Sequence, residues 1–246
     1  MYHASLPLFS LVKNREGSER GVLESFSVTE NPNLILASNS PRRLQLLALA
    51  GWKFSVSAAN VDESPRPNEE PADYVLRLAE AKARAAVGDT DQFVLAADTA
   101  VVDGMDILGK PKDNAEAIAM LKRLRGHTHQ VYTGVALLRL SDGLLLKDVC
   151  VTDVPMRGYL DEEILNYVQT GDPLDKAGAY AIQHSGFRPV ENMSGCYANV
   201  MGLPMCHIIR MMQMINIHPN TDVFAVCETS LGNECAVAET ILRGEM

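Results

Sequence analysis

A short apolar run that leads directly into a helix start is the feature that most constrains this chain. Residues 34–37, Leu-Ile-Leu-Ala, form a continuous apolar run that is typical of an inner strand. Ser40 is a favoured N-cap residue, and Pro41 suits the first turn of a helix. The sequence therefore predicts a buried strand followed at once by a helix over residues 41–50.

Two arginines, Arg42 and Arg43, fall in the first turn of that expected helix. The N-terminus of a helix carries unpaired N–H groups and a partial positive charge, so it attracts anions and disfavours cations. Guanidinium groups match the oxygens of a phosphate, and a polyphosphate between the helix and the arginines would explain their position. A solvated helix start with two surface arginines explains this segment equally well.

Composition narrows the class of protein. The chain has 246 residues, of which 47% are hydrophobic and 22% charged, which is ordinary for a soluble globular protein. Its net charge of −9 argues against a nonspecific nucleic-acid binder. No apolar run is long enough to span a bilayer, and the first 20 residues do not resemble a secretory signal. The five cysteines form no CxxC pair, so we expect reduced thiols in a cytoplasmic protein.

Strand and helix signals alternate along the chain, which favours an α/β architecture. We expect an N-terminal extension over residues 1–32, one domain over 33–217 and an appended tail over 218–246. The expected helices are 41–50, 71–88, 114–125, 161–169 and 204–214, and the expected strands include 34–37, 53–57 and 93–97, with a hairpin turn at 141–143.

Lys82 is the residue whose position is hardest to explain by structure alone. On a helix that begins at Pro71, it falls within the apolar stripe that contains Val75, Leu78 and Ala79. A lysine on a core-facing stripe must either find an anionic partner or extend its ammonium group out to solvent. The first alternative would aim the ammonium at a carboxylate or a phosphate in a cleft.

Two carboxylates are candidate partners. Asp98 follows the apolar run 93–97, and we expect it at the carboxyl end of an inner strand, where open α/β sheets place ligand sites. A carboxylate there can bind Mg²⁺ or take a proton from water, but it can also simply start a turn. Glu63 lies in an expected loop, where it is either a second metal ligand or an exposed side chain.

Further charged residues stand next to small or rigid ones. Lys110 lies between a glycine and a proline, and the pair Asp175-Lys176 precedes Ala-Gly-Ala. A surface turn and a local ion pair are the simpler interpretations of these two segments. Together with Lys82 and the carboxylates, however, they suit a metal-assisted attack of water on a polyphosphate. The glycine-rich motifs of P-loop and dinucleotide-binding proteins are absent, and we do not expect His127 and His129 to bind a metal.

In this order along the chain, these segments resemble the Maf family of nucleoside triphosphate pyrophosphatases. The resemblance covers roughly residues 33–214 and rests on Ser38-Asn-Ser-Pro-Arg-Arg43, Glu63, Lys82-Ala83, Ala97-Asp98-Thr99, Gly109-Lys110-Pro111, Asp175-Lys176-Ala177-Gly178, Tyr180-Ala-Ile182-Gln183 and Gly202-Leu203-Pro204. It implies an elongated, two-lobed α/β fold, with a mixed sheet and flanking helices around a deep cleft, similar to inosine triphosphate pyrophosphatases. It also implies hydrolysis of a nucleoside triphosphate to the monophosphate and pyrophosphate with a divalent cation, Mg²⁺ or Mn²⁺.

The resemblance assigns roles residue by residue. Asp98 corresponds to the proton acceptor, and Glu63 and Asp98 to the metal ligands, with Lys82 beside them in the catalytic group. The residues that would contact the substrate are Ser38, Ser40, Arg42, Arg43, Thr99, Lys110, Asp175, Lys176 and Gln183. Family members are often homodimers; we expect no nucleic acid and no membrane among the partners.

The stretch from Tyr180 to Gln183 is similar to the subfamily that acts on dTTP and UTP, in which the positions of Arg42, Thr99 and Gln183 govern specificity. An amide such as that of Gln183 both donates and accepts hydrogen bonds, which suits the edge of a pyrimidine. His184 stands where a glycine is expected, which puts the base preference and the loop shape in question. Two alternatives stay open: a pyrophosphatase for 7-methyl-GTP or another modified nucleotide, and a non-hydrolysing nucleotide-binding regulator of cell division.

Overall fold

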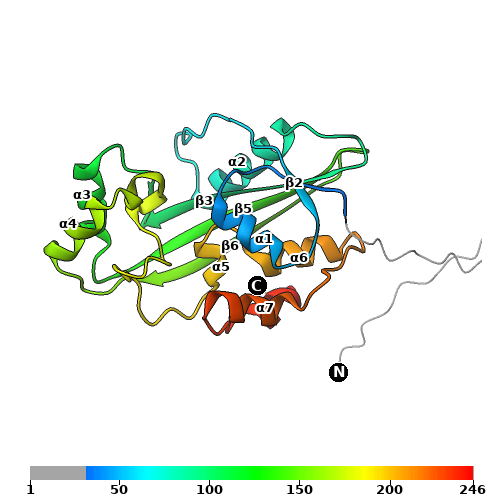
Figure 1. Cartoon of the computed structure of the whole chain (residues 1–246). Helices are drawn as coiled ribbons and strands as arrows, with labels where there is room; N and C mark the ends of the chain where they lie inside the picture. Colours follow the sequence, from blue (N-terminus) through cyan, green and yellow to red (C-terminus); the bar gives the residue numbers. More distant parts are fainter. Residues whose placement is uncertain (1–31, 246) are drawn as a thin grey trace, which may run out of the picture.

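The computed structural model describes residues 32–245, and within them one mixed sheet forms the centre of the fold (Figure 1). Its six strands run in the order β2-β1-β3-β5-β6, with β4 paired to β3. β1 is parallel to β2 and β3, whereas β4 and β5 are antiparallel to β3 and β6 is antiparallel to β5. The strands are β1 (Leu34–Leu36), β2 (Phe54–Val56), β3 (Phe93–Asp103), β4 (Asp106–Leu108), β5 (Thr128–Arg139) and β6 (Leu145–Pro155). The expected α/β class with a mixed sheet and flanking helices is confirmed.

Helices cover both faces of this sheet. The α-helices are α1 (Pro41–Ala48), α2 (Pro71–Ala85), α3 (Asn114–Leu124), α4 (Asp161–Gln169), α5 (Tyr197–Val200), α6 (Met205–Gln213), α7 (Val223–Leu231) and α8 (Ala238–Leu242). In Figure 1, α2 lies on one face of the sheet and α1 and α6 on the other, while α3 and α4 pack together at the far end of the long strands. The expected helices therefore form within a few residues of their predicted limits.

Alternation along the strands decides which side chains each helix covers. Leu34 and Leu36 of β1 join the core beneath α1 and α6, whereas Ile35 between them joins the smaller cluster beneath α2. A separate core lies at the other end of the molecule, where Leu121 of α3 and Ile164 of α4 are fully buried. The fold thus has two lobes that share the long strands β3, β5 and β6.

β3 differs from the expectation in a way that matters for the site. The apolar residues 100–102 continue the strand to Asp103, so Asp98 lies in its interior and not at its carboxyl end. The same edge of β3 pairs with β1 as far as Leu95 and with β4 from Val101 onward. No described strand pairs with this edge at residues 98–100, and the sheet is split there. The ligand position expected at a strand end is instead created by the end of β1.

Residues 218–245, in the segment expected as an appended tail, contain two further helices. They form α7 and α8, whose Val223 and Ile241 are buried. The indole Nε1 of Trp52 donates to the carbonyl of His218 at 3.0 Å, which ties this segment to the body of the fold. The domain limits themselves stay a prediction, and the expected N-terminal extension falls almost wholly outside the described residues. Among residues 32–245, no helix is long and apolar enough to cross a membrane.

The close contact between α2 and the sheet predicts that replacing one glycine will strongly lower the stability of the fold. A Cβ at Gly134 of β5 would lie 2.6 Å from the backbone of Val75, so α2 would have to move away from the sheet. We expect Gly134→Ala to lower the free energy of unfolding by about 3 kcal/mol, measured by urea denaturation. Gly158→Ala is the matched control, because a Cβ at Gly158 meets nothing within 4 Å. Equal stability of the two variants would contradict this packing.

Candidate active site

A cleft of about 700 Å³ opens at the split in the sheet. It brings together residues from β3, α1, α2 and the loops after β1, β2, β4 and α4, which lie far apart in the sequence. All twelve side chains singled out by the sequence line it: Ser38, Ser40, Arg42, Arg43, Glu63, Lys82, Asp98, Thr99, Lys110, Asp175, Lys176 and Gln183. Their individual roles stay predictions, but their assembly in one cavity is a finding.

Lys82 lies at the centre of the acidic part of the cleft. Its Nζ is 2.6 Å from Oδ1 of Asp98 and 2.6 Å from Oε1 of Glu63. The side chains of Lys82 and Asp98 are only 11% and 10% exposed, whereas that of Glu63 is 53% exposed. The lysine on the apolar stripe of α2 therefore has anionic partners and does not extend out to solvent.

The combined effects of burial and neighbouring charges shift the pKa values of the two carboxyl groups in opposite directions. Burial raises the pKa of Asp98 above its ordinary value, although Lys82 and Arg43 act against this shift. Burial also acts to raise the pKa of Glu63, but the hydrogen bond and charge of Lys82 outweigh it and the pKa is lowered. Relative to the same groups in water, the site thus makes Asp98 a stronger base and holds Glu63 more firmly as a carboxylate.

Arg43 is fixed on the opposite side of β3. Its Nε donates to the carbonyl of Gly202 at 2.8 Å, and its Nη2 donates to the hydroxyl of Thr99 at 3.0 Å. The Thr99 hydroxyl is in turn 3.0 Å from that of Thr133 on β5. Gly202 has φ +103°, and a Cβ there would come within 3.2 Å of both the guanidinium and the threonine hydroxyl. A glycine is required at this point for the backbone to approach Arg43.

The start of α1 supplies groups suited to phosphate oxygens. Ser40 occupies the N-cap position, but its side chain makes no capping hydrogen bond, so first-turn N–H groups of α1 remain available to a ligand. The Ser38 hydroxyl accepts from the backbone N–H of Ser40 at 3.1 Å. Arg42 and Lys110 line the cleft and form no ion pair with any residue in 32–245. These two cations have charge to offer to an anionic ligand.

Lys176 behaves differently. Its side chain is only 8% exposed, and its ammonium contacts Oδ1 of Asp172 at 2.9 Å and Oδ1 of Asp175 at 2.6 Å. The simpler interpretation of a local ion pair therefore describes it well. The adjoining turn is joined to the segment that carries Lys110, because the N–H of Gly178 donates to the carbonyl of Gly109 at 3.1 Å. Lys176 therefore shapes the wall of the cleft around its own carboxylates.

Gln183 is exposed within the cleft, and the residue after it explains the loop that follows. Nδ1 of His184 accepts from the N–H of Phe187 at 2.9 Å, and its ring packs edge-on against Tyr167 with centroids 4.6 Å apart. His184, which replaces an expected glycine, thus holds the turn over residues 184–188 together. Its side chain acts on the shape of the loop beside Gln183.

Three residues near the site escaped the sequence analysis. Tyr74 of α2 donates its hydroxyl to the carbonyl of Glu63 at 2.9 Å and so holds the loop that carries this carboxylate. Burial, together with the charges of Asp98 and Glu63, raises the pKa of Tyr74 to about 12, so it stays a donor. Thr133 and Asn199 are fully buried behind Thr99. No sequence motif marks them, because their importance depends on pairing between distant segments.

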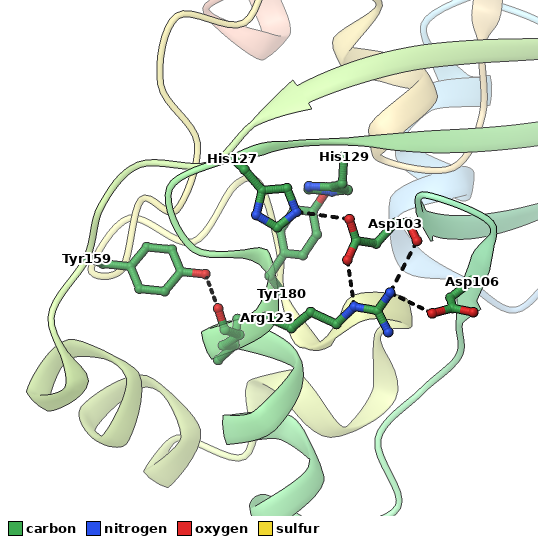
Figure 2. A network of polar contacts seen from close by, with 8 residues as sticks. Asp103, Asp106, Arg123, His127, His129, Tyr159 and Tyr180 are labelled. Atoms are coloured by element: carbon green, nitrogen blue, oxygen red, sulfur yellow. Dashed lines mark hydrogen bonds and ion pairs between the residues drawn. The ribbon is translucent and has the colours of Figure 1, made fainter.

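The polar network near the far end of β3 is structural (Figure 2). Arg123 bridges Asp103 and Asp106, and His127 contacts Asp103 at 2.9 Å. Nε2 of His129 pairs with the Tyr180 hydroxyl at 2.9 Å, and burial lowers the pKa of this histidine to about 4.

Within residues 32–245, no group of three or more His, Cys, Asp or Glu side chains is placed to hold a metal ion, and all five cysteines are free thiols.

The chain is similar to known proteins over most of its length. The family model described as "Maf-like protein" matches residues 33–215. Curated relatives named "dTTP/UTP pyrophosphatase" include one from Geobacter sulfurreducens, 48% identical over 76% of this chain and 98% of that protein. Others are from Geobacter metallireducens, 49% identical over 73% and 94%, and from Dehalococcoides mccartyi, 42% identical over 78% and 86%.

Among solved structures, a HAM1 protein from Coxiella burnetii is 19% identical over 63% of this chain and 89% of that chain, with a TM-score of 0.38. The Staphylococcus aureus Ham1 protein is 14% identical over 64% and 90%, with a TM-score of 0.37.

The buried pair predicts a pH-dependent effect of removing Lys82. In Lys82→Met, the pKa of Asp98 rises further, so its ionisation in the folded state costs stability once the pH exceeds the unfolded value of about 4. We expect the variant to lose about 3 kcal/mol of unfolding free energy relative to the parent near pH 7 and progressively less towards pH 4, measured by urea denaturation. The control is the double variant Lys82→Met with Asp98→Asn, whose deficit should grow less with pH, because only Glu63 then loses the favourable charge of Lys82. A deficit in Lys82→Met that is the same at both pH values would show that Asp98 does not cause it.

Proposed function

The chain belongs to the Maf family, and we propose that it is a nucleoside triphosphate pyrophosphatase that hydrolyses dTTP and UTP to the nucleoside monophosphate and pyrophosphate. The observation that carries the reaction class is the Lys82–Asp98–Glu63 group, with unpaired cations lining the same cleft. The choice of dTTP and UTP is supported by the names of relatives that are 41–49% identical to the chain over most of its length. A carboxylate base beside phosphate-binding groups is what such a hydrolysis requires.

In this proposal Asp98 acts as the general base. Its Oδ1 is occupied by Lys82, so Oδ2 is the oxygen that takes the proton from water as the water oxygen attacks the α-phosphorus. The bond from the α-phosphorus to the oxygen that bridges it to the β-phosphate breaks, and pyrophosphate leaves. The raised pKa of Asp98 makes it a better proton acceptor than an ordinary aspartate, while the charge and hydrogen bond of Lys82 act to favour its carboxylate form.

The negative charge of the triphosphate is met by cations that line the cleft. Lys110 has no ion-pair partner in residues 32–245, and the first turn of α1 adds N–H donors. Arg43 is held by Gly202 and Thr99 and cannot swing freely. Fixed donors of this kind stabilise charge that develops in the transition state without having to reorganise.

The donor set fits a divalent cation that arrives with the nucleotide. Glu63 and Asp98 place carboxylate oxygens on the same ammonium nitrogen, so they lie side by side and can share one ion. Mg²⁺ is commonly held by one or two carboxylates together with phosphate oxygens and water, which agrees with the lack of a third protein ligand among the described residues. We propose that these two residues hold Mg²⁺ or Mn²⁺, which when bound neutralises charge on the triphosphate.

The two alternatives differ from this proposal in the nucleobase that is bound or in the role of the carboxylates. A pyrophosphatase for 7-methyl-GTP would use the same chemistry with a different nucleobase in the region of Gln183. A non-hydrolysing regulator of cell division would have no use for a buried general base held at a raised pKa beside a lysine.

A cytoplasmic location and a homodimer stay predictions of the sequence.

Asp98→Asn should separate turnover from binding. We expect the parent to release pyrophosphate from dTTP and UTP faster than from CTP, 7-methyl-GTP or ITP, and the variant to be about 10³-fold slower because it lacks the base. Asp142→Asn, in the exposed hairpin, is the matched control and should keep full activity. A purine preference would favour the first alternative, and nucleotide binding without turnover under Mg²⁺ and Mn²⁺ would favour the second.

Glu63→Gln tests the metal proposal. The amide is a weaker ligand than the carboxylate, so we expect the dissociation constant for Mn²⁺, measured by electron paramagnetic resonance with a non-hydrolysable nucleotide bound, to rise about tenfold. Glu69→Gln is a suitable control, because Glu69 pairs with Arg77 outside the cleft lining. Unchanged Mn²⁺ binding in Glu63→Gln would remove this residue from the ligand set.

A further inference from the structure

A chain of hydroxyl groups leads from the interior of the fold to the cleft. Thr99 of β3 and Thr133 of β5 stand directly opposite each other in the antiparallel pair, and their hydroxyl oxygens are 3.0 Å apart. Thr133 is completely buried, and its hydroxyl is also 3.0 Å from the backbone carbonyl of Asn199. Thr99 is partly exposed and lines the cleft.

The direction of each hydrogen bond in this series of hydroxyl groups follows from the groups at its two ends, the Asn199 carbonyl and the Arg43 guanidinium. A carbonyl oxygen only accepts, so the single hydroxyl proton of Thr133 goes to Asn199. The proton between the two threonines must therefore come from Thr99. At the other end, a guanidinium only donates, so the Thr99 oxygen accepts from Nη2 of Arg43.

The carbonyl that sets this direction is itself held in place. The side-chain Nδ2 of Asn199 donates to the carbonyl of Val131 and to the hydroxyl of Thr152, both at 2.9 Å. The N–H of Gly202 also donates to this carbonyl, at 2.9 Å. Reversing the hydroxyl chain would nevertheless leave the buried oxygens of Thr133 and Asn199 facing each other at 3.0 Å with no proton between them, which is costly. The Thr99 hydroxyl thus has no proton left for a ligand, and what it presents to the cleft is a lone pair.

We propose that Thr133 is a positioning residue that fixes Thr99 as a hydrogen-bond acceptor in the cleft, and that this polarity selects a base carrying an N–H donor on its edge. This inference rests on the proposed function, and it names the recognition of uracil and thymine over cytosine as its consequence. N3 of uracil and thymine carries a hydrogen, whereas N3 of cytosine carries a lone pair. An acceptor that faces a second acceptor leaves both unsatisfied, and such mismatches discriminate strongly between ligands.

The rest of the cleft has the complementary groups. The Arg42 guanidinium and the Gln183 amide both line it, and both can donate to the carbonyl oxygens that flank N3 in uracil and thymine. A donor, an acceptor and a donor together match the imide edge. Cytosine has an amino group in place of one of these carbonyls and would face a donor with a donor.

The test compares Thr133→Val with Thr133→Ser in the full chain. Valine keeps the shape but frees the Thr99 hydroxyl to turn and donate, whereas serine retains the hydroxyl chain. Dissociation constants for UTP and CTP analogues with an imido bridge between the α- and β-phosphates are measured by calorimetry. We expect the preference for the UTP analogue to fall about tenfold in Thr133→Val and to be retained in Thr133→Ser. Unfolding curves establish whether each variant is folded.

Thr99→Val provides the second variant in case Thr133→Val does not fold. It removes the acceptor at a partly exposed position, and we expect it to weaken binding of the UTP analogue while binding of the CTP analogue changes little. An unchanged preference in a folded Thr133→Val or in Thr99→Val would overturn the inference, as would equal binding of the two analogues by the parent.

Binding of these analogues needs no turnover, so the two proposals fail separately. If the parent releases no pyrophosphate from UTP, the proposed function is wrong. If the parent hydrolyses UTP but the variants keep its base preference, only the role of Thr133 and Thr99 is wrong.

Discussion

The ion pair between Lys82 and Asp98 is the interaction on which the organisation of the cleft depends. Burying an unpaired ammonium or carboxylate costs several kcal/mol, so each residue stabilises the other in its buried position. Lys82 projects from α2 and Asp98 from β3, and their contact at 2.6 Å fixes how this helix lies on the sheet. The close approach of α2 to Gly134 belongs to the same constraint, because a wider separation would pull the ammonium away from the carboxylate.

The split along one edge of β3 explains why a charged group can lie so deep in a sheet. β1 ends at Leu36, and its chain turns away into α1, whereas β4 begins to pair with β3 only at Val101. Between these strands the side chains of β3 reach a cavity on both faces of the sheet. The same break brings the N-terminus of α1 next to Asp98, although the two belong to different βα units.

Part of this site could be predicted because its signals are local. The stripe on α2 indicated that Lys82 must either find an anionic partner or extend to solvent, and the turn at Ser40 and Pro41 indicated a helix N-terminus. The position of Asp98 within its strand was predicted wrongly, because two polar residues in succession resemble a strand end. They continue the strand because each has a partner on a different face, Lys82 for one and Arg43 for the other. Thr133 and Asn199 could not be found at all, since nothing near them in sequence shows which residues they face.

The alternation of β3 separates two tasks that active sites often combine. Asp98 points towards α2, where it meets Lys82 and Glu63, and the next residue, Thr99, points towards α1 and Arg43. The hydroxyl chain behind Thr99 ends at Asn199 and has no hydrogen bond to the carboxylate group. A substitution on the Thr99 face can therefore alter which ligand is recognised while the base and its lysine keep their geometry. The two faces of one strand thus give this fold a physical route to a change of substrate without loss of the reaction.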